Sequence, residues 1–200
     1  RRGKREERRE ERGERRGEER SSRKQEDTTK NGYFFKDAAK FLYADLLIME
    51  GDQQKASDLL EGLSKTYPGN SRVQLRYISL LLEQALLEET ISFGEQFLRE
   101  QHQDIDKDLV RLWITRAHLA LDTVHKAKNT FSTINQKIEQ SGDLPPWGRH
   151  WLLLTRGQIA DLDNHRADAV QNYQRIIDEG PYVNPAILAA ARQGIESPFR

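Results

Sequence analysis

The chain contains five histidines, the side chains best suited to bind a metal or to move a proton near neutral pH. Two ligands on one helix face need a spacing such as His-x-x-x-His or Glu-x-x-His, and no histidine here has it. We therefore interpret the histidines as surface or turn residues and predict no metal site and no cofactor. The five are His102, His118, His125, His150 and His165.

Three alternating aspartates resemble the first ligands of a calcium-binding loop: Asp104, Asp106 and Asp108. Leu109 and Thr115 occupy the places where such a loop needs its glycine and its bidentate glutamate. The acidic run therefore predicts the start of a helix, where the helix dipole favours negative charge.

Other catalytic signatures are missing from the sequence after residue 32. It has no Gly-x-Ser-x-Gly, no phosphate-binding Gly-x-x-x-x-Gly-Lys and no Gly-x-Gly-x-x-Gly. The chain also has no cysteine, which excludes disulfides, thiolate metal sites and a cysteine nucleophile. We expect a protein that is not an enzyme and has no catalytic residues.

Charge divides the chain into a tail and a body. Residues 1–30 hold 13 Lys/Arg and 9 Asp/Glu, so the tail is net basic and residues 31–200 are net acidic. We predict that residues 1–32 form an Arg/Glu-rich tail and linker, either disordered or a solvated helix, and that 33–200 form the folded domain.

Amphipathic helices separated by short breakers fill the body. Ala56, Leu60 and Leu63 lie on one helix face, and the same spacing returns at Ala127 and at Ala169. In the four units this small residue is Ala56, Thr90, Ala127 and Ala169. These positions are 34, 37 and 42 residues apart. An earlier apolar helix precedes each one, at 41–49, 73–82, 109–121 and 151–162. The turns inside the pairs at 51–52, 122–123 and 163–164 carry side chains that can cap the next helix. The fold class is therefore all-α, built from repeated helix pairs.

These small and aromatic positions resemble the tetratricopeptide repeat (TPR) family, as bacterial TPR domain proteins have them. The last unit matches at Gly157, Ala169, Tyr173 and Pro181, and the first at Ala44, Ala56, Leu60 and Pro68. The middle units depart from the pattern, with Ile78, Thr90, Gly94 and Thr115 at the corresponding places. The resemblance implies a TPR-like α-solenoid of about four helix pairs plus a C-terminal capping helix at 185–193.

The resemblance also implies a concave groove lined by the first helix of each pair, suited to an amphipathic helix or an extended peptide. Its polar candidates for partner binding are Asp45, Arg72, Ser79, Arg116, Gln158 and Asp161. Apolar neighbours such as Leu112 and Leu154 either line the groove or pack between helices. Trp147, on the longest insertion, is a further candidate contact, because contact residues favour loops on a rigid scaffold.

Some TPR proteins clamp a terminal carboxylate with Lys, Asn and Arg side chains. The corresponding places here hold Phe41, Asp45, Ser79, Leu109 and Trp113, so this clamp is not present. We predict a non-catalytic protein-interaction scaffold with a protein or peptide partner.

Two alternatives remain open at this stage. The basic tail at residues 1–24 offers nucleic-acid or anionic-surface binding, although its glutamates cancel most of the positive field. The chain could also be the docking domain of a larger enzyme. No apolar run approaches the roughly 20 residues that cross a bilayer. We expect a soluble protein, cytoplasmic or periplasmic, whose oligomeric state the sequence does not indicate.

Overall fold

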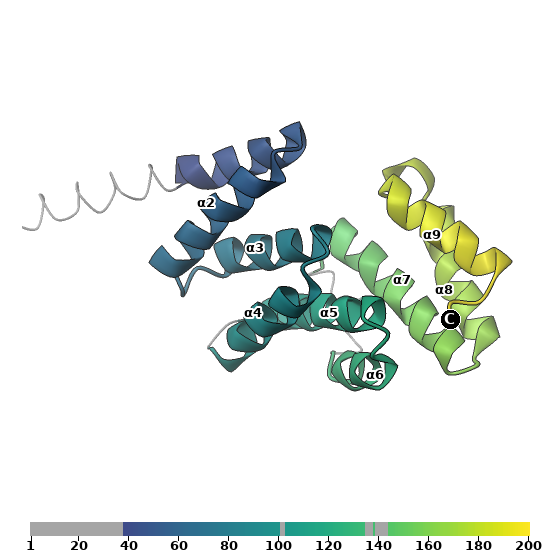
Figure 1. The fold of residues 1–200 in the computed structure, drawn as a ribbon. Helices are drawn as coiled ribbons and strands as arrows, with labels where there is room; N and C mark the ends of the chain where they lie inside the picture. Colours follow the sequence, from purple (N-terminus) through teal and green to yellow (C-terminus); the bar gives the residue numbers. More distant parts are fainter. Residues whose placement is uncertain (1–37, 101–102, 135–137, 139–143) are drawn as a thin grey trace, which may run out of the picture. The chain divides into compact units, whose positions relative to one another are not determined.

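The computed structural model describes residues 38–100, 103–134, 138 and 144–200, and every regular element within these ranges is helical. The predicted tail, its boundary at residue 32, and His102 lie outside the described residues. A first helix occupies 38–50. It is followed by α2 (Gln53–Thr66), α3 (Ser71–Glu83), α4 (Leu87–Arg99), α5 (Asp104–Ala120), α6 (Val124–Ser132), α7 (Pro146–Leu162), α8 (Arg166–Asp178), the 3-10 turn η1 (Gly180–Tyr182) and α9 (Pro185–Glu196) (Figure 1).

The chain divides into two units, residues 1–59 and 60–200. In the first unit the helix at 38–50 buries Phe41, Ala44 and Leu47 on one side. Its other side leaves a row of large apolar side chains exposed: Leu42, Tyr43, Leu46 and Met49.

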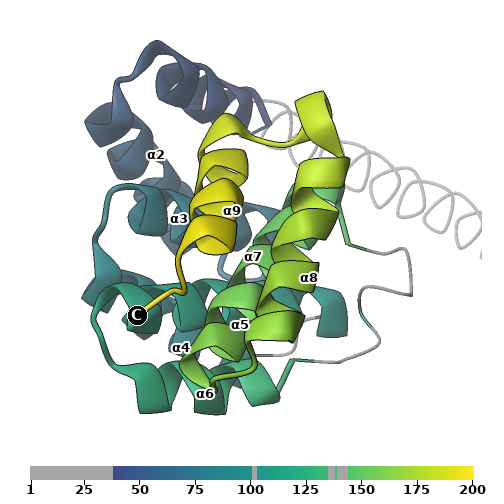
Figure 2. The same cartoon turned by 90° about the vertical axis from the view of Figure 1, so that its right-hand side faces the viewer.

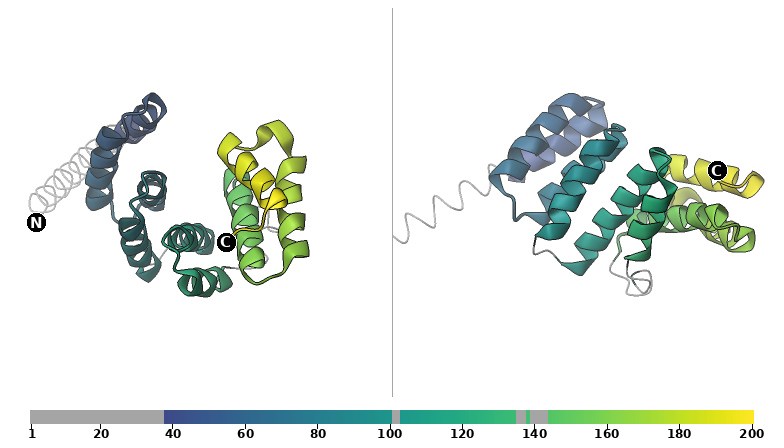
Figure 3. Two further views of the ribbon diagram at one scale, coloured as in Figure 1. Left: turned by 45° about the vertical axis from the view of Figure 1, so that its right-hand side comes forward. Right: turned by 60° about the horizontal axis from the view of Figure 1, so that its bottom comes forward.

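In the second unit, helices that are neighbours in sequence are also neighbours in space. The helix α3 packs on α4, α4 on α5, α5 on α6, and α7 on α8 (Figure 3). The first helices also touch one another, α3 with α5 and α5 with α7. The last helix, α9, lies against both α7 and α8 (Figure 2). The all-helical prediction and the sequential pairing are therefore confirmed.

The turn inside each helix pair has the same structure four times. Each contains one residue with positive φ, and these residues recur at the predicted spacings of 34, 37 and 42: Gly51, Ala85, Asp122 and Asn164. The amide of this residue bonds to the carbonyl three residues earlier at 3.0–3.1 Å. The next amide bonds to the carbonyl five residues before it at 2.8–2.9 Å. This pair of bonds is the Schellman motif, which satisfies the last carbonyls of the first helix.

The small residues of the repeat are the most deeply buried. Ala56, Thr90, Ala127 and Ala169 in the second helices have no exposed surface, and neither do Ala44, Ile78 and Thr115 in the first helices. The threonines fit because their hydroxyls donate to backbone, Thr90 Oγ1 to Leu86 O at 2.7 Å and Thr115 Oγ1 to Arg111 O at 2.8 Å. The equivalent positions of the middle helix pairs are thus as deeply buried as those of the outer pairs.

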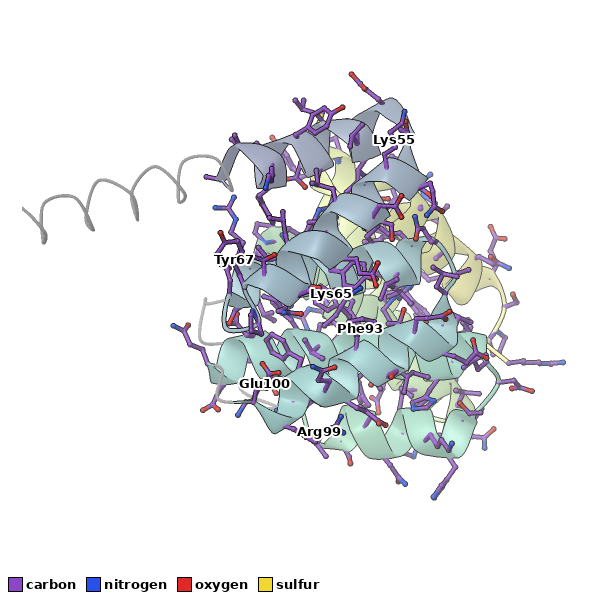
Figure 4. All side chains as sticks on the ribbon, turned by 60° about the vertical axis from the view of Figure 1, so that its left-hand side comes forward. Lys55, Lys65, Tyr67, Phe93, Arg99 and Glu100 are labelled. Atoms are coloured by element: carbon purple, nitrogen blue, oxygen red, sulfur yellow. The ribbon has the colours of Figure 1, made fainter. Side chains whose placement is uncertain are left out.

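Aromatic and charged contacts join successive helices. Tyr77 of α3 meets Phe93 of α4 edge to face, with ring centroids 5.0 Å apart (Phe93 is labelled in Figure 4). Lys128 of α6 donates to Leu162 O at 3.1 Å and pairs with Asp163 at 2.5 Å. A cation is favourable there because the last carbonyls of α7 carry partial negative charge.

Three local predictions need correction. In the sequence, the apolar spacing that starts at Ala127 continues through Ile134 to Ile138 and predicts a helix of that length. The structure ends α6 at Ser132, and Ile134 and Ile138 are buried beyond it. The helix predicted from residue 151 begins at Pro146, because proline is compatible with the first helical turn. Side-chain capping occurs at Asp52, which accepts from the Lys55 amide at 3.4 Å, but not at the starts of α6 and α8. There, the Schellman turns set the geometry instead.

No helix in the described part of the chain is long and apolar enough to span a membrane.

Candidate partner-binding surface

Two ring contacts join the first helices α5 and α7. Trp113 of α5 stacks on Trp147 of α7 with parallel planes and centroids 6.2 Å apart. One turn further along, the guanidinium carbon of Arg116 lies 3.5 Å from the centre of the Trp151 ring. Residues three and four apart share a helix face, so both contacts belong to one line. We call these four residues the α5–α7 seam.

Trp147 is the exposed end of the seam. It retains 48% of its accessible surface, whereas its stacking partner Trp113 is buried. The sequence places Trp147 on a loop, and the structure corrects this: it is the second residue of α7. The Trp147 ring therefore has a fixed position and one open side, as an apolar contact surface requires.

Arg116 has a cation–π contact with Trp151 but no ion pair with any residue that the structure describes. Its Nε is enclosed and has no hydrogen bond among the described residues. Burial lowers the pKa of Arg116 to about 9. The guanidinium is still charged at neutral pH, and its interaction with the face of Trp151 only partly replaces the lost water.

Gln158 lies two turns after Trp151 on the same face of α7 and is half-buried. Its amide makes no hydrogen bond with any residue that the structure describes. It is therefore a second polar side chain on the face of α7 that carries Trp151.

Asp161 is placed differently from the other seam neighbours, because its side chain faces the interior. Its carboxylate accepts from Tyr173 Oη at 2.9 Å, from Arg166 at 3.0 and 3.2 Å, and from the Phe199 amide at 2.9 Å. Arg166 also donates to Ile195 O at 2.6 Å. Asp161 therefore holds the C-terminal segment against α7 and α8 and is not part of the candidate surface.

The remaining predicted residues lie elsewhere. Asp45 is half-buried in the first unit, and Arg72 is exposed on α3. Ser79, also on α3, donates to Arg76 O at 2.9 Å and lies 3.3 Å from the Arg76 guanidinium. Leu112 and Leu154 are buried between helices, so the packing alternative holds for both.

The histidines form no metal cluster in the part of the chain that the structure describes. His125 and His165 are exposed, as predicted. His150 is buried, contrary to the prediction, with Nε2 2.6 Å from Glu179. His118 is also buried, with Nδ1 2.9 Å from Thr123 Oγ1, and burial lowers the pKa of His118. Both join the ends of packed helices.

The acidic run is a helix start, as predicted. Asp104 and Asp106 lie in the first turn of α5. Asp108 is buried and pairs with Arg111 at 2.7 Å.

An open hollow of about 410 Å³ lies among α6, α7 and α8, and its lining includes Phe131, Arg156, Asp163 and Arg175. Its charged groups have both signs, and Asp163 is already paired with Lys128. Since none of the predicted binding residues lines it, the α5–α7 seam is the stronger candidate surface.

The sequence indicates Arg116 and Trp147 as contact residues, and it indicates packing roles for Trp113 and Trp151 because both fall inside predicted first helices. The packing role is confirmed for both, since Trp113 is buried and Trp151 packs against two core clusters, and Trp151 also lies against the Arg116 guanidinium. A signal for the seam exists in the sequence, because Trp113 and Arg116 are three apart and Trp147 and Trp151 four apart.

No protein-family model, curated protein or solved structure matches the chain. What the described residues establish is an all-helical domain of sequentially packed helices.

Proposed function

We propose that this chain is a non-catalytic protein-interaction scaffold of TPR-like helix pairs, which binds a peptide or a partner helix along its first helices. The recurring Schellman turns and the buried small residues at equivalent places support the repeat. Contact between α3 and α5, and between α5 and α7, supports a binding surface made by first helices.

The single observation that carries the proposal is the α5–α7 seam. It combines a rigid, half-exposed tryptophan with an arginine that has no ion pair among the described residues. Tryptophan and arginine are the side chains most enriched among those that dominate binding energy at protein interfaces.

Selection from a phage-displayed library of random twelve-residue peptides tests the proposal. We expect the full chain to select peptides that bind at micromolar affinity or better. Trp147→Ala should weaken them at least tenfold, a loss of about 1.4 kcal/mol or more, because it removes the exposed ring from the seam.

Tyr182→Ala is the matched control. Tyr182 is an equally large aromatic residue, 88% exposed, on η1 rather than on the seam. Its substitution should change affinity less than twofold. Failure to select any peptide, or equal losses for the two variants, would contradict the proposal.

A further inference from the structure

The charge on Arg116 is the feature of the seam that packing does not explain. Arg116 is half-buried. The part of a cation that loses its water is stable when a carboxylate or another acceptor replaces that water, and the enclosed Nε has neither in the described structure. Other arginines near these helices show the usual solution: Arg111 pairs with Asp108, and Arg149 pairs with Glu179. Arg116 therefore has an unused capacity to bind an anion.

The charged side chains around Arg116 limit the number of negative charges that the anion can carry. The one acidic residue of α7, Asp161, is already committed to Tyr173 and Arg166. Arg111 and Arg149 are neutralised by their own partners, so the seam offers one free positive charge among the residues described. Phosphate groups are usually recognised by several cations, whereas one guanidinium matches one carboxylate.

The net negative charge of residues 31–200 also favours a partner with few acidic groups. Residues 31–200 carry 23 acidic and 19 basic side chains, so their long-range field repels a strongly acidic partner. A peptide with one acidic residue gains the local ion pair without that repulsion. The exposed ring of Trp147 in the same line is suited to an apolar side chain next to it.

We propose that Arg116 binds one side-chain carboxylate, an aspartate or glutamate, of a mainly apolar partner peptide whose neighbouring apolar residue packs on Trp147. This inference rests on the proposed function. The sequence lacks the carboxylate clamp of some TPR proteins, and Arg116 is not at one of the clamp positions. The inference therefore assigns carboxylate binding to a different position.

The test uses the selected peptides, synthesised with both ends blocked so that side chains are their only carboxylates. Each aspartate or glutamate is replaced in turn by asparagine or glutamine, and binding to the full chain is measured by calorimetry. For one acidic position per peptide, the amide should weaken binding at least tenfold, because it cannot form the charged pair.

Arg116→Met supplies the matched protein variant, since methionine keeps an unbranched apolar stem beside Trp151 and removes the charge. We expect it to bind acid and amide peptides within twofold of each other. Its thermal midpoint should equal or exceed that of the parent chain, because the substitution removes a half-buried charge whose enclosed Nε has no acceptor among the residues described. Arg192→Met, a change of an exposed arginine on α9, should leave the tenfold preference intact.

Three results would overturn the inference. Peptides that bind equally well after every aspartate and glutamate is replaced would show that the chain recognises no carboxylate, while the proposed function would stand. A tenfold preference that persists in Arg116→Met would place the carboxylate elsewhere. A single-stranded oligouridylate that displaces the peptides, and does so only when Arg116 is present, would favour nucleic acid. Failure to select any peptide contradicts the proposed function itself.

Discussion

Tyr173 shows how single residues fix the packing of the last three helices. Its ring lies between Gly157 of α7 and Gly194 of α9. A Cβ added at Gly194 would lie 2.6 Å from ring atom Cε2, and one at Gly157 would overlap Cε1. The hydroxyl is held by Asp161 at 2.9 Å, and burial, together with this bond, raises the pKa of Tyr173. The ring therefore has no freedom to move aside.

Gly157→Ala should accordingly destabilise the chain by about 1–3 kcal/mol, because the added methyl group overpacks a fixed ring. The midpoint of urea unfolding measures this change. Gly62→Ala is the matched control, since a Cβ at Gly62 in α2 meets nothing within 4 Å. It should stabilise by up to about 1 kcal/mol through helix propensity. If Gly157→Ala is as stable as Gly62→Ala, the close contact with Tyr173 does not exist.

For single residues, the repeat spacing predicts which residue type stands at a position. It does not predict which side chains that residue contacts. The small residue at 157 and the aromatic residue at 173 follow from the repeat spacing. The interior position of Asp161 does not, because its partners Tyr173, Arg166 and the Phe199 amide come from 5 to 38 residues away. Packing of α8 on α7 brings Tyr173 and Arg166 to this carboxylate, and docking of the C-terminal segment adds the Phe199 amide.

At the scale of the element, the four turns share a geometry that their sequences do not share. Gly51 is suited to positive φ, and Asp122 and Asn164 tolerate it, but Ala85 adopts φ 57° with a Cβ in the way. The spacing of the small residues predicts where these turns lie. It does not predict their hydrogen bonds, because the motif depends on backbone conformation rather than on capping side chains.

Ala85→Gly should therefore stabilise the chain, by about 0.5–1 kcal/mol, since relief of the left-handed strain exceeds the extra entropy of glycine in the unfolded state. The same substitution at Ala189, exposed inside α9, should destabilise by about 0.5–1 kcal/mol. Urea unfolding of both variants checks the opposite signs. Destabilisation by both would mean that Ala85 is not held in this conformation.

Across the whole molecule, the helix-pair order is predictable because one pair cannot bury both of its apolar faces and must stack on the next. The seam is less predictable. Its contacts join residues 113 and 116 to 147 and 151 across a long connection, and their register depends on how α7 starts. Because Pro146 begins α7 five residues before the predicted start, Trp147 becomes part of a helix face rather than of a loop.

The chain has three tryptophans, and all of them lie in the seam. Their indole N–H signals in a ¹H–¹⁵N spectrum of the full chain, assigned by single Trp→Phe variants, therefore report on this surface directly. Titration with a selected peptide should shift the Trp147 and Trp151 signals in proportion to the bound fraction measured by calorimetry. Saturating peptide that leaves all three indole signals unchanged would contradict binding along the α5–α7 seam.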